Sequence, residues 1–502
     1  MRRSIFSLLV VAGVLATFSC SKIIDNPTQS DNYYRYQFAY SMMDTYYLWR
    51  EEVLTELQKW TVEDDHVAKV NSLRYKDASG KAVDKWTTLM SDCRPFLGTV
   101  TGNTDSFGFD FLLVGDAETQ TVEHAVITYT YADSPARQAG LKRGDVFLTL
   151  NGERITTDNY RILFEGGTVR LGMENGTTVS LTAVQMYEDP IQTVRTFTYG
   201  GKKVGYLHFT NFTLTAAGDL EDVFRQFKAD GIDELVLDLR YNGGGYSLTS
   251  QCLASMIAPK ANLDAGNIFN QEIYNANFDA ELSRFGNTLK FKDEDGVEQT
   301  IRAGEVNPGL GRLWVITTGS SASASESLIC GLKPYMPVYV TGRRTYGKFC
   351  GGYFIQAKDF WDAVAGQQIY GIDADAGKAA TENWGIYVMS SRYADCAGQT
   401  LSMPDGIAAD YEAFDNPLDG YALGDPNESM LAAVLEVMVP GGGAFGVSAR
   451  GGVRAGAAGG DDGAVGGDAG AAGGVQRRSA SWSSTLIAPE KPGFGALVLD
   501  RP

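Results

Sequence analysis

One apolar segment runs directly into a series of very small residues, and this junction limits the folds that the chain can adopt. Residues 313–318 (Leu-Trp-Val-Ile-Thr-Thr) have the continuous apolar character of a buried strand. A serine-rich stretch at 319–325 follows, then a helix-like segment to Leu332 and a second strand-like segment at 338–341. Buried strands joined through a helix are typical of a parallel sheet with α/β architecture.

The serines at this junction are candidates for chemistry or for helix capping. A hydroxyl at the start of a helix lies beside unpaired N–H groups and the positive end of the helix dipole, which stabilise developing negative charge. Ser323 is followed three residues later by Glu326, which is the spacing of a capping box. Capping is therefore the alternative interpretation.

A second apolar segment, residues 234–239, leads through Arg240 into Tyr-Asn-Gly-Gly-Gly at 241–245. Consecutive glycines let the backbone approach a substrate carbonyl, and their N–H groups can point at an oxyanion. The alternative is a glycine-rich turn after a buried strand. We expect Asp238 and Arg240 to order this loop as an ion pair rather than to take part in chemistry.

Lys348 follows the strand-like segment 338–341 and precedes Phe349 and Cys350. A lysine can activate a serine only when its amine is neutral, and burial lowers the pKa of a lysine because it disfavours the charged form. The apolar surroundings predict a lysine that points inward. Cys350 is a rival nucleophile, but the alternation of side chains favours a strand residue near the site.

These elements resemble the tail-specific, or C-terminal-processing, serine proteases, which carry a Ser-Ala-Ser-Glu segment and a Gly-Lys about one strand later. Ser323 and Lys348 match those two positions and lie 25 residues apart. The resemblance implies a Ser323/Lys348 catalytic dyad. It also implies an oxyanion hole in which the N–H of Ala324 acts with that of Gly244 or Gly245, and it implies no metal and no organic cofactor.

The resemblance further implies a mixed α/β (α+β) fold, with a ClpP/crotonase-like catalytic domain over residues 195–438. Two positions depart from the pattern of some family members. Pro334 stands where an Asp occurs, and Gly352 stands where a Gln follows the lysine by four residues. Groups outside the motif are therefore needed to orient the lysine.

Residues 100–188 resemble a PDZ domain. The stretch 133–145 is similar to the turn–helix–turn of that fold, and the Asn-Gly pair at 151–152 predicts a β-hairpin turn. PDZ domains bind the C-terminus of another chain as an added strand. The corresponding edge here contains Phe107, Gly108 and Phe109. The alternative is a structural insert that only gates the catalytic domain.

The first residues have the pattern of an export signal. Residues 1–19 combine an Arg pair with an apolar run too short to span a membrane. The Thr-Phe-Ser-Cys sequence that ends at Cys20 is similar to a lipoprotein cleavage box, and Ser21 is consistent with sorting to the outer membrane. We expect a lipidated Cys20 and a tether over 20–30. The alternative is an ordinary secretory signal.

The remaining segments flank the catalytic and PDZ regions. Residues 31–95 predict a small helical domain, whose apolar stripe (Phe38, Met42, Tyr46 and Trp49) is expected to be core. Residues 439–502 form a Gly/Ala-rich linker and tail. The tail is a candidate for trimming or for occupying the PDZ groove of its own chain.

Composition excludes some classes of function. The 502 residues, 44% of them hydrophobic, suffice for two or three globular domains, and the net charge of −18 argues against binding to nucleic acid. The three histidines (His66, His124 and His208) form no ligand-spaced cluster, so a zinc hydrolase is not expected. His208 is the candidate for a Ser-His-Asp triad, but a hydrogen-bonded strand residue is the favoured interpretation. Five cysteines beside Cys20 predict no disulfide framework.

The sequence therefore predicts an exported serine endopeptidase that is lipid-anchored in the cell envelope and selects polypeptides by their C-termini through its PDZ domain. Its partners would be polypeptide substrates and the membrane, and no nucleic acid. The oligomeric state is left open. The alternative is a peptide-binding lipoprotein of the same fold without turnover, and a hydrolase of small esters or glycans is disfavoured because no sugar-site signature is present.

Overall fold

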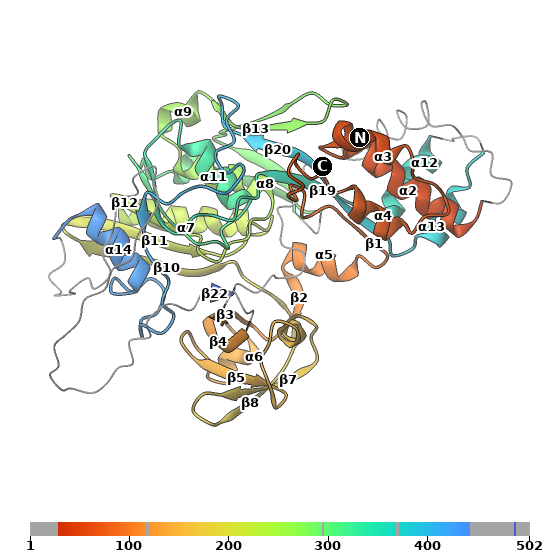
Figure 1. The fold of residues 1–502 in the computed structure, drawn as a ribbon. Coiled ribbons are helices and arrows are strands. Elements are labelled where there is room, and N and C mark those ends of the chain that lie inside the picture. The colour runs from red at the N-terminus through yellow and green to blue at the C-terminus, as the bar shows by residue number, and fades with distance from the viewer. Residues whose placement is uncertain (1–28, 117–120, 294–295, 368–370, 442–485, 488–502) are drawn as a thin grey trace.

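The computed structural model of the chain describes residues 29–116, 121–293, 296–367, 371–441 and 486–487 (Figure 1). The signal segment, Cys20 and most of the predicted tether and tail lie outside these residues. In the described part of the chain, no helix is long and apolar enough to cross a membrane. Figure 1 shows the PDZ region below, the N-terminal helices at the right and the serine-bearing helix at the upper left.

The predicted buried strands form the middle of a six-stranded sheet in which the strands after the first hairpin run parallel. All residues of its two central strands are buried, which explains their continuous apolar sequence. In spatial order the strands are β10 (Ile191–Tyr199), β11 (Lys202–Phe209), β12 (Glu234–Asp238), β17 (Leu313–Thr317), β18 (Val338–Gly342) and β21 (Tyr411–Glu412).

Helices cover both faces of this sheet because successive strand residues point to opposite sides. Leu237 and Val315 contribute to the core that includes α7 (Ala216–Asp230), α8 (Ser247–Ile257) and α11 (Ala324–Leu332). The alternate residues Val236 and Trp314 pack with α14 (Ser429–Met438). The predicted strand–helix alternation is confirmed. Two short helices, α9 (Lys260–Asp264) and α10 (Ala303–Val306), complete this part.

A second, antiparallel sheet lies next to the first. It contains β1 (Thr88–Met90), β20 (Gly385–Ala394), β13 (Ile268–Tyr274), β14 (Glu281–Arg284) and β19 (Cys350–Gln356). The polar stretch after residue 264 supplies β13, β14 and the hairpin of β15 (Leu289–Lys292) and β16 (Glu298–Ile301).

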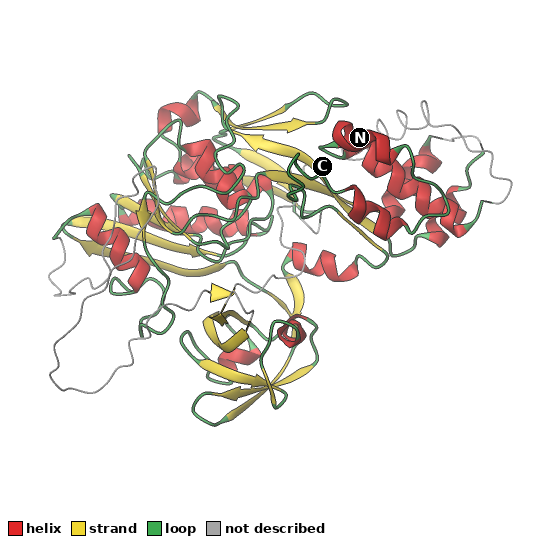
Figure 2. Ribbon diagram, viewed as in Figure 1, coloured by secondary structure: helices red, strands yellow, loops and turns green. Residues whose placement is uncertain are grey.

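The N-terminal helices share their core with the catalytic region instead of forming one of their own. Tyr34 meets Trp361 edge-on with ring centroids 5.5 Å apart, and the aromatic stripe of the N-terminal segment is buried as predicted. Figure 2 shows these helices gathered at one end of the antiparallel sheet. They are α2 (Asp31–Tyr46), α3 (Arg50–Leu57), α4 (His66–Leu73) and α5 (Arg94–Thr101), with α12 (Ala357–Gly366) and α13 (Ala374–Ala380).

The PDZ region has its own sheet and its own core. Asn151 and Gly152 both adopt positive φ, 53° and 92°, so the predicted hairpin turn is confirmed. The elements are β3 (Phe109–Asp116), β4 (Thr121–Thr130), α6 (Pro135–Gln138), β5 (Val146–Leu150), β6 (Glu153–Arg154), η1 (Asn159–Phe164), β7 (Thr168–Met173) and β8 (Thr178–Thr182).

Two further strand pairings lie at the borders of the PDZ region. Strands β2 (Asn103–Ser106) and β9 (Val184–Tyr187) pair where the chain enters and leaves the PDZ region. A short strand from the tail, β22 (Leu486–Ile487), pairs antiparallel with Leu113 and Val114 of β3. The tail therefore adds a strand to the PDZ sheet, further along β3 than Phe107, Gly108 and Phe109.

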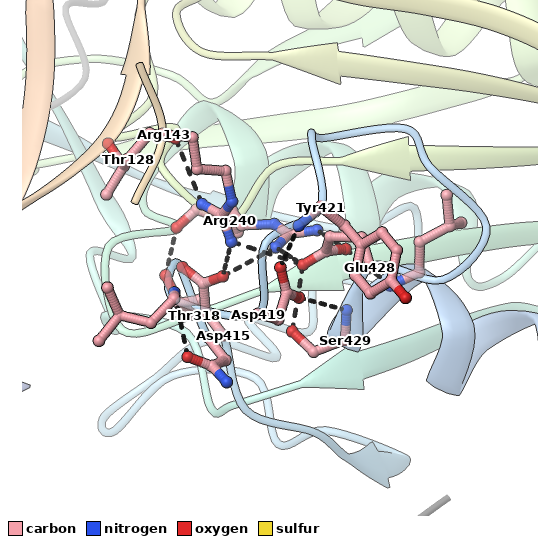
Figure 3. A network of polar contacts seen from close by, with 12 residues as sticks. Thr128, Arg143, Arg240, Thr318, Asp415, Asp419, Tyr421, Glu428 and Ser429 are labelled. Atoms are coloured by element: carbon pink, nitrogen blue, oxygen red, sulfur yellow. Dashed lines mark hydrogen bonds and ion pairs between the residues drawn. The ribbon is translucent and has the colours of Figure 1, made fainter. Parts of the chain in front are cut away.

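A buried ionic network joins the PDZ region to the catalytic region (Figure 3). Arg143 of the PDZ region lies 2.6 Å from Asp415 and donates to the Tyr241 hydroxyl at 2.8 Å. Arg240 pairs with Asp238 at 2.6 Å and with Glu428 at 2.6 Å, as expected for its ordering role. Burial alone would raise the pKa of Asp415, but the two guanidinium groups hold it at about 2.

We expect Arg143→Met to destabilise the protein by about 3 kcal/mol, because removing one partner leaves buried acceptors short of a donor. Urea unfolding followed by fluorescence measures the effect. The neighbouring Lys142→Met is the matched control, since that side chain is exposed. Equal midpoints for the two variants would contradict the structural role of Arg143.

Candidate functional site

Ser323 lies at the turn between β17 and α11, where two loops predicted from the sequence are bound together. The loops follow neighbouring parallel strands, so they meet at the same edge of the sheet. The Asn242 carbonyl accepts from the Ala322 N–H at 3.0 Å and from the Ser325 hydroxyl at 3.1 Å. The Ser321 hydroxyl donates to the Leu239 carbonyl at 2.7 Å. These bonds position the serine turn against the glycine loop.

The backbone of Ser323 is strained, with φ 58° and ψ −108°, a combination that few non-glycine residues adopt. Its side chain is only 1% exposed, and its Oγ has no hydrogen-bond partner. The residue borders a small pocket of about 20 Å³ together with Gly245 and Ala324. A buried hydroxyl without a partner, in a strained turn, is an arrangement that chemistry can use. The predicted capping pair is also present, since the Ser323 N–H donates to the Glu326 carboxylate at 2.8 Å at the start of α11.

The glycine loop contacts the serine turn so closely that side chains are excluded. A Cβ on Gly244, where φ is 110°, would lie 2.9 Å from the Ser323 Cβ. The Gly244 N–H donates to Asn242 Oδ1 at 2.8 Å, so it is not directed at a substrate. The prediction of Gly244 as an oxyanion donor therefore needs correction, because the loop uses this N–H for its own turn. Gly245 and Ala324, which border the pocket, are the two positions that can serve.

Lys348 is fully buried, as its sequence surroundings predict. Its Nζ donates to the Tyr387 hydroxyl at 3.2 Å and lies 5.3 Å from the Trp86 ring and 5.2 Å from the Tyr387 ring. Burial lowers the pKa of Lys348 to about 7, against smaller opposing effects of Cys350, Asp84 and Glu326. The neutral form of the amine is therefore accessible near neutral pH.

Ser323 and Lys348 are not hydrogen-bonded to each other, since the Ser323 Oγ has no partner and the lysine amine is directed to Tyr387. The Glu326 carboxylate brings their backbones together. One oxygen, Oε2, accepts from the N–H of Ser323 at 2.8 Å and from the N–H of Lys348 at 2.8 Å. The nucleophile candidate and the base candidate are thus fixed to the same atom.

The other oxygen, Oε1, accepts from the Thr345 hydroxyl at 2.5 Å and from the Gly347 N–H at 2.8 Å. Burial raises the pKa of Glu326, and these four donors oppose the rise. The sequence pointed to Glu326 only through its capping-box spacing. Its link to Lys348 could not be read from that spacing, because the bond joins residues 22 positions apart.

The surroundings of two other candidate catalytic residues argue against a catalytic role. Cys350 is buried with its Sγ 3.5 Å from the Met389 Sδ, and burial raises the pKa of its thiol well above the ordinary value. It is therefore not a thiolate nucleophile. His208 is fully buried between the rings of Tyr129 and Tyr241, and neither of its ring nitrogens has a partner.

The expectation of a hydrogen-bonded His208 was therefore wrong. Aromatic packing at the PDZ contact replaces polar partners there, and burial lowers the pKa of His208 to about 4. Nor does His208 border the Ser323 pocket. Within the described ranges, no group of three His, Cys, Asp or Glu side chains could hold a metal ion.

The predicted peptide edge of the PDZ region is engaged in its own fold. The Phe107 carbonyl accepts from the Ala136 N–H at 3.0 Å, and the Gly108 N–H donates to the Ser106 hydroxyl at 2.9 Å. Phe109 pairs with Thr130 of β4. A carboxylate at this loop would have to displace Ser106 to reach the Gly108 N–H.

We expect Glu326→Gln to lower the stability of the catalytic region by roughly 3 kcal/mol, because the amide nitrogen would face two of the four donors. Thermal unfolding measures the loss. Glu305→Gln, at an exposed position of α10, is the matched control. If Glu326→Gln and this control unfold at the same midpoint temperature, the carboxylate does not hold the two turns.

Comparison with known proteins adds to this geometry. Residues 203–413 match the model of peptidase family S41, and residues 126–171 match that of the PDZ domain. A crystal structure of an S41 protease from Bacteroides fragilis covers 80% of this chain and 96% of its own, with a TM-score of 0.57 and 22% identity. At that identity the likeness concerns the fold.

Two curated relatives are similar in sequence. The carboxy-terminal processing protease CtpB of Bacillus subtilis is 26% identical over 313 residues, which cover 60% of each chain. A CtpA-like serine protease of Staphylococcus aureus is 27% identical over 252 residues, 48% of this chain and 45% of the relative. The chain thus spans about half to three-fifths of these relatives. The region that carries Ser323 and Lys348 thus resembles peptidase family S41, and it is joined in one chain to a region that resembles a PDZ domain.

Proposed function

We propose that the chain is a serine-type peptidase that cleaves polypeptides, with Ser323 as the nucleophile and Lys348 as the general base. One observation carries the proposal. A fully buried lysine with a pKa of about 7 and a strained serine with an unpartnered hydroxyl are fixed to one carboxylate oxygen. The lowered pKa supports a lysine that can act as a base, and the shared carboxylate anchors the backbones of both residues.

In the proposed reaction the neutral Lys348 amine takes the Ser323 hydroxyl proton as Oγ bonds to the scissile carbonyl carbon. The N–H groups of Ala324 and Gly245 stabilise the negative charge on the carbonyl oxygen. The C–N bond then breaks, and the Lys348 ammonium gives its proton to the leaving amine. Water, deprotonated by Lys348, attacks the acyl-enzyme. The bond from the carbonyl carbon to Ser323 Oγ breaks as the Lys348 ammonium returns the proton to Oγ, which releases the new C-terminus and restores the neutral amine.

This cycle requires Nζ to turn from Tyr387 toward Ser323. The hydrogen bond to Tyr387 and the contact with the Trp86 ring hold the amine in its present position. Tyr387 also supplies the polar contact that Gly352, standing in place of a Gln, does not offer. We infer that substrate in the Ser323 pocket favours the turned lysine, because the hydroxyl then has a reaction partner.

Substrate choice and location form the outer part of the proposal. The PDZ region would select polypeptides by their C-termini, supported by its match to the domain family. Export and lipidation at Cys20, with attachment to the cell envelope, are supported by the signal-like residues 1–19. No cofactor enters the reaction.

The second candidate is peptide binding without turnover. It is favoured by the absence of a hydrogen bond between Ser323 and Lys348 in this conformation. It differs from the first in one measurable respect, since a binding protein does not form a covalent adduct at Ser323.

We expect a fluorophosphonate probe to label the wild type at Ser323, and casein to be degraded. Ser323→Ala and Lys348→Met should each reduce casein cleavage by more than about 10⁴-fold, because nucleophile and base act as one unit. Ser320→Ala, in the same serine run but away from the pocket, is the control and should retain activity. An unlabelled wild type with full peptide binding would support the second candidate.

We expect kcat/KM to fall below pH 7, approaching tenfold per pH unit, because protonation of Lys348 removes the base. In Tyr387→Phe the midpoint of this fall should move to lower pH by roughly one unit, since the lost oxygen stabilised the ammonium form. Initial rates across pH 5–9 measure both effects. Tyr411→Phe, a tyrosine of β21, should keep the wild-type profile. A flat profile through the acid range would argue against a lysine base.

A further inference from the structure

A second pocket, of about 220 Å³, lies where α2 meets the β13–β14 hairpin, and the proposed mechanism does not use it. Four aromatic rings enclose it, those of Tyr46, Tyr274, Phe278 and Tyr353. Tyr46 stacks on Phe278 at 5.6 Å, and Tyr274 stacks on Tyr353 at 6.3 Å. Asp279, Ala280 and Glu281 complete the lining. We call these seven residues the aromatic box.

The aromatic box adjoins the Ser323 pocket on one face of the antiparallel sheet. On β13, Asn270 and Glu272 border the Ser323 pocket, and Tyr274, two residues further along, borders the box. On β14, Ser283 borders the Ser323 pocket and Glu281 borders the aromatic box. Side chains two residues apart share a face of a strand, so the pockets are offset by about 7 Å along the sheet.

A hydrogen bond links the two pockets. The Tyr274 hydroxyl, from the box, donates at 2.9 Å to Glu272, whose carboxylate borders the Ser323 pocket. The offset of about 7 Å equals the advance of two residues in an extended peptide. A polypeptide lying along this face would therefore present alternate side chains to the two pockets.

The charge of both pockets has one sign. Among the described residues that line them, the charged side chains are Glu272 in the first and Asp279 and Glu281 in the second, and none is Lys or Arg. Aromatic faces attract cations, and nearby carboxylates add to this attraction. The net charge of −18 also favours the approach of cationic polypeptide segments.

We propose that the aromatic box is a specificity subsite for a Lys or Arg side chain of the substrate polypeptide. This side chain lies two positions from the substrate residue that lies at Ser323. The long methylene stem packs on the four rings, and the cationic end lies between them and the carboxylates of Asp279 and Glu281. The inference rests on the proposed peptidase function and names the class of polypeptide that the site prefers.

The test compares fluorogenic peptides that carry Lys, Arg or norleucine, which has the carbon chain of Lys without its charge, at one position. That position is moved in turn through the residues that flank the cleaved bond. We expect a Lys or Arg at one position to raise kcat/KM about tenfold over norleucine. Glu281→Gln should remove this advantage by lowering the rates on the Lys and Arg peptides to that on the norleucine peptide. Phe278→Ala should lower the rates on all three peptides, because each side-chain stem packs on this ring. Glu298→Gln, on the exposed edge of β16, is the matched control and should keep the preference.

Binding of the same peptides to Ser323→Ala, measured by fluorescence anisotropy, gives a readout that needs no turnover. Equal binding of the Lys and norleucine peptides at every position overturns the subsite, as does a preference that survives in Glu281→Gln. Failure of the proposed function looks different, because the wild type then hydrolyses no peptide and takes up no fluorophosphonate. In that case the aromatic box is still supported if the anisotropy assay shows tighter binding of the Lys or Arg peptide and Glu281→Gln abolishes this difference.

Discussion

The catalytic region depends on one buried carboxylate. Glu326 accepts four hydrogen bonds, from the turn that carries Ser323 and from the loop that ends at Lys348. A buried carboxylate without partners would cost several kcal/mol, so the fold is stable only when both segments close on it. The positions of serine and lysine therefore follow from folding itself, without a direct bond between the two side chains.

The environment of Lys348 is assembled from distant parts of the chain. Trp86 comes from the segment that follows the N-terminal helices, and Tyr387 comes from β20. Because the N-terminal helices share one core with the catalytic region, the cover over the lysine is as rigid as that core. Distant segments also meet around Arg240, where Arg143 of the PDZ region pairs with Asp415 (Figure 3).

Much of the local structure could be predicted from the sequence. The continuous apolar segments predicted the central strands β12 and β17, and the Asn151-Gly152 pair predicted the hairpin turn. The Asp238–Arg240 pair was also anticipated, since its members are two residues apart. The roles of Glu326 and Tyr387 and the unpaired state of His208 were missed, because each depends on contacts between segments far apart in the chain. Gly244 was misassigned since its N–H bonds within its own loop.

The sequence by itself determined the order of strands and helices, the two small-residue loops and the spacing of Ser323 from Lys348, because these depend on neighbours along the chain. Tertiary structure alone decided which groups surround the lysine and that its amine is directed to Tyr387. It also decided that an aromatic box lies beside the Ser323 pocket. The physical reason is that burial, and with it the pKa of Lys348, depends on how completely distant segments exclude water.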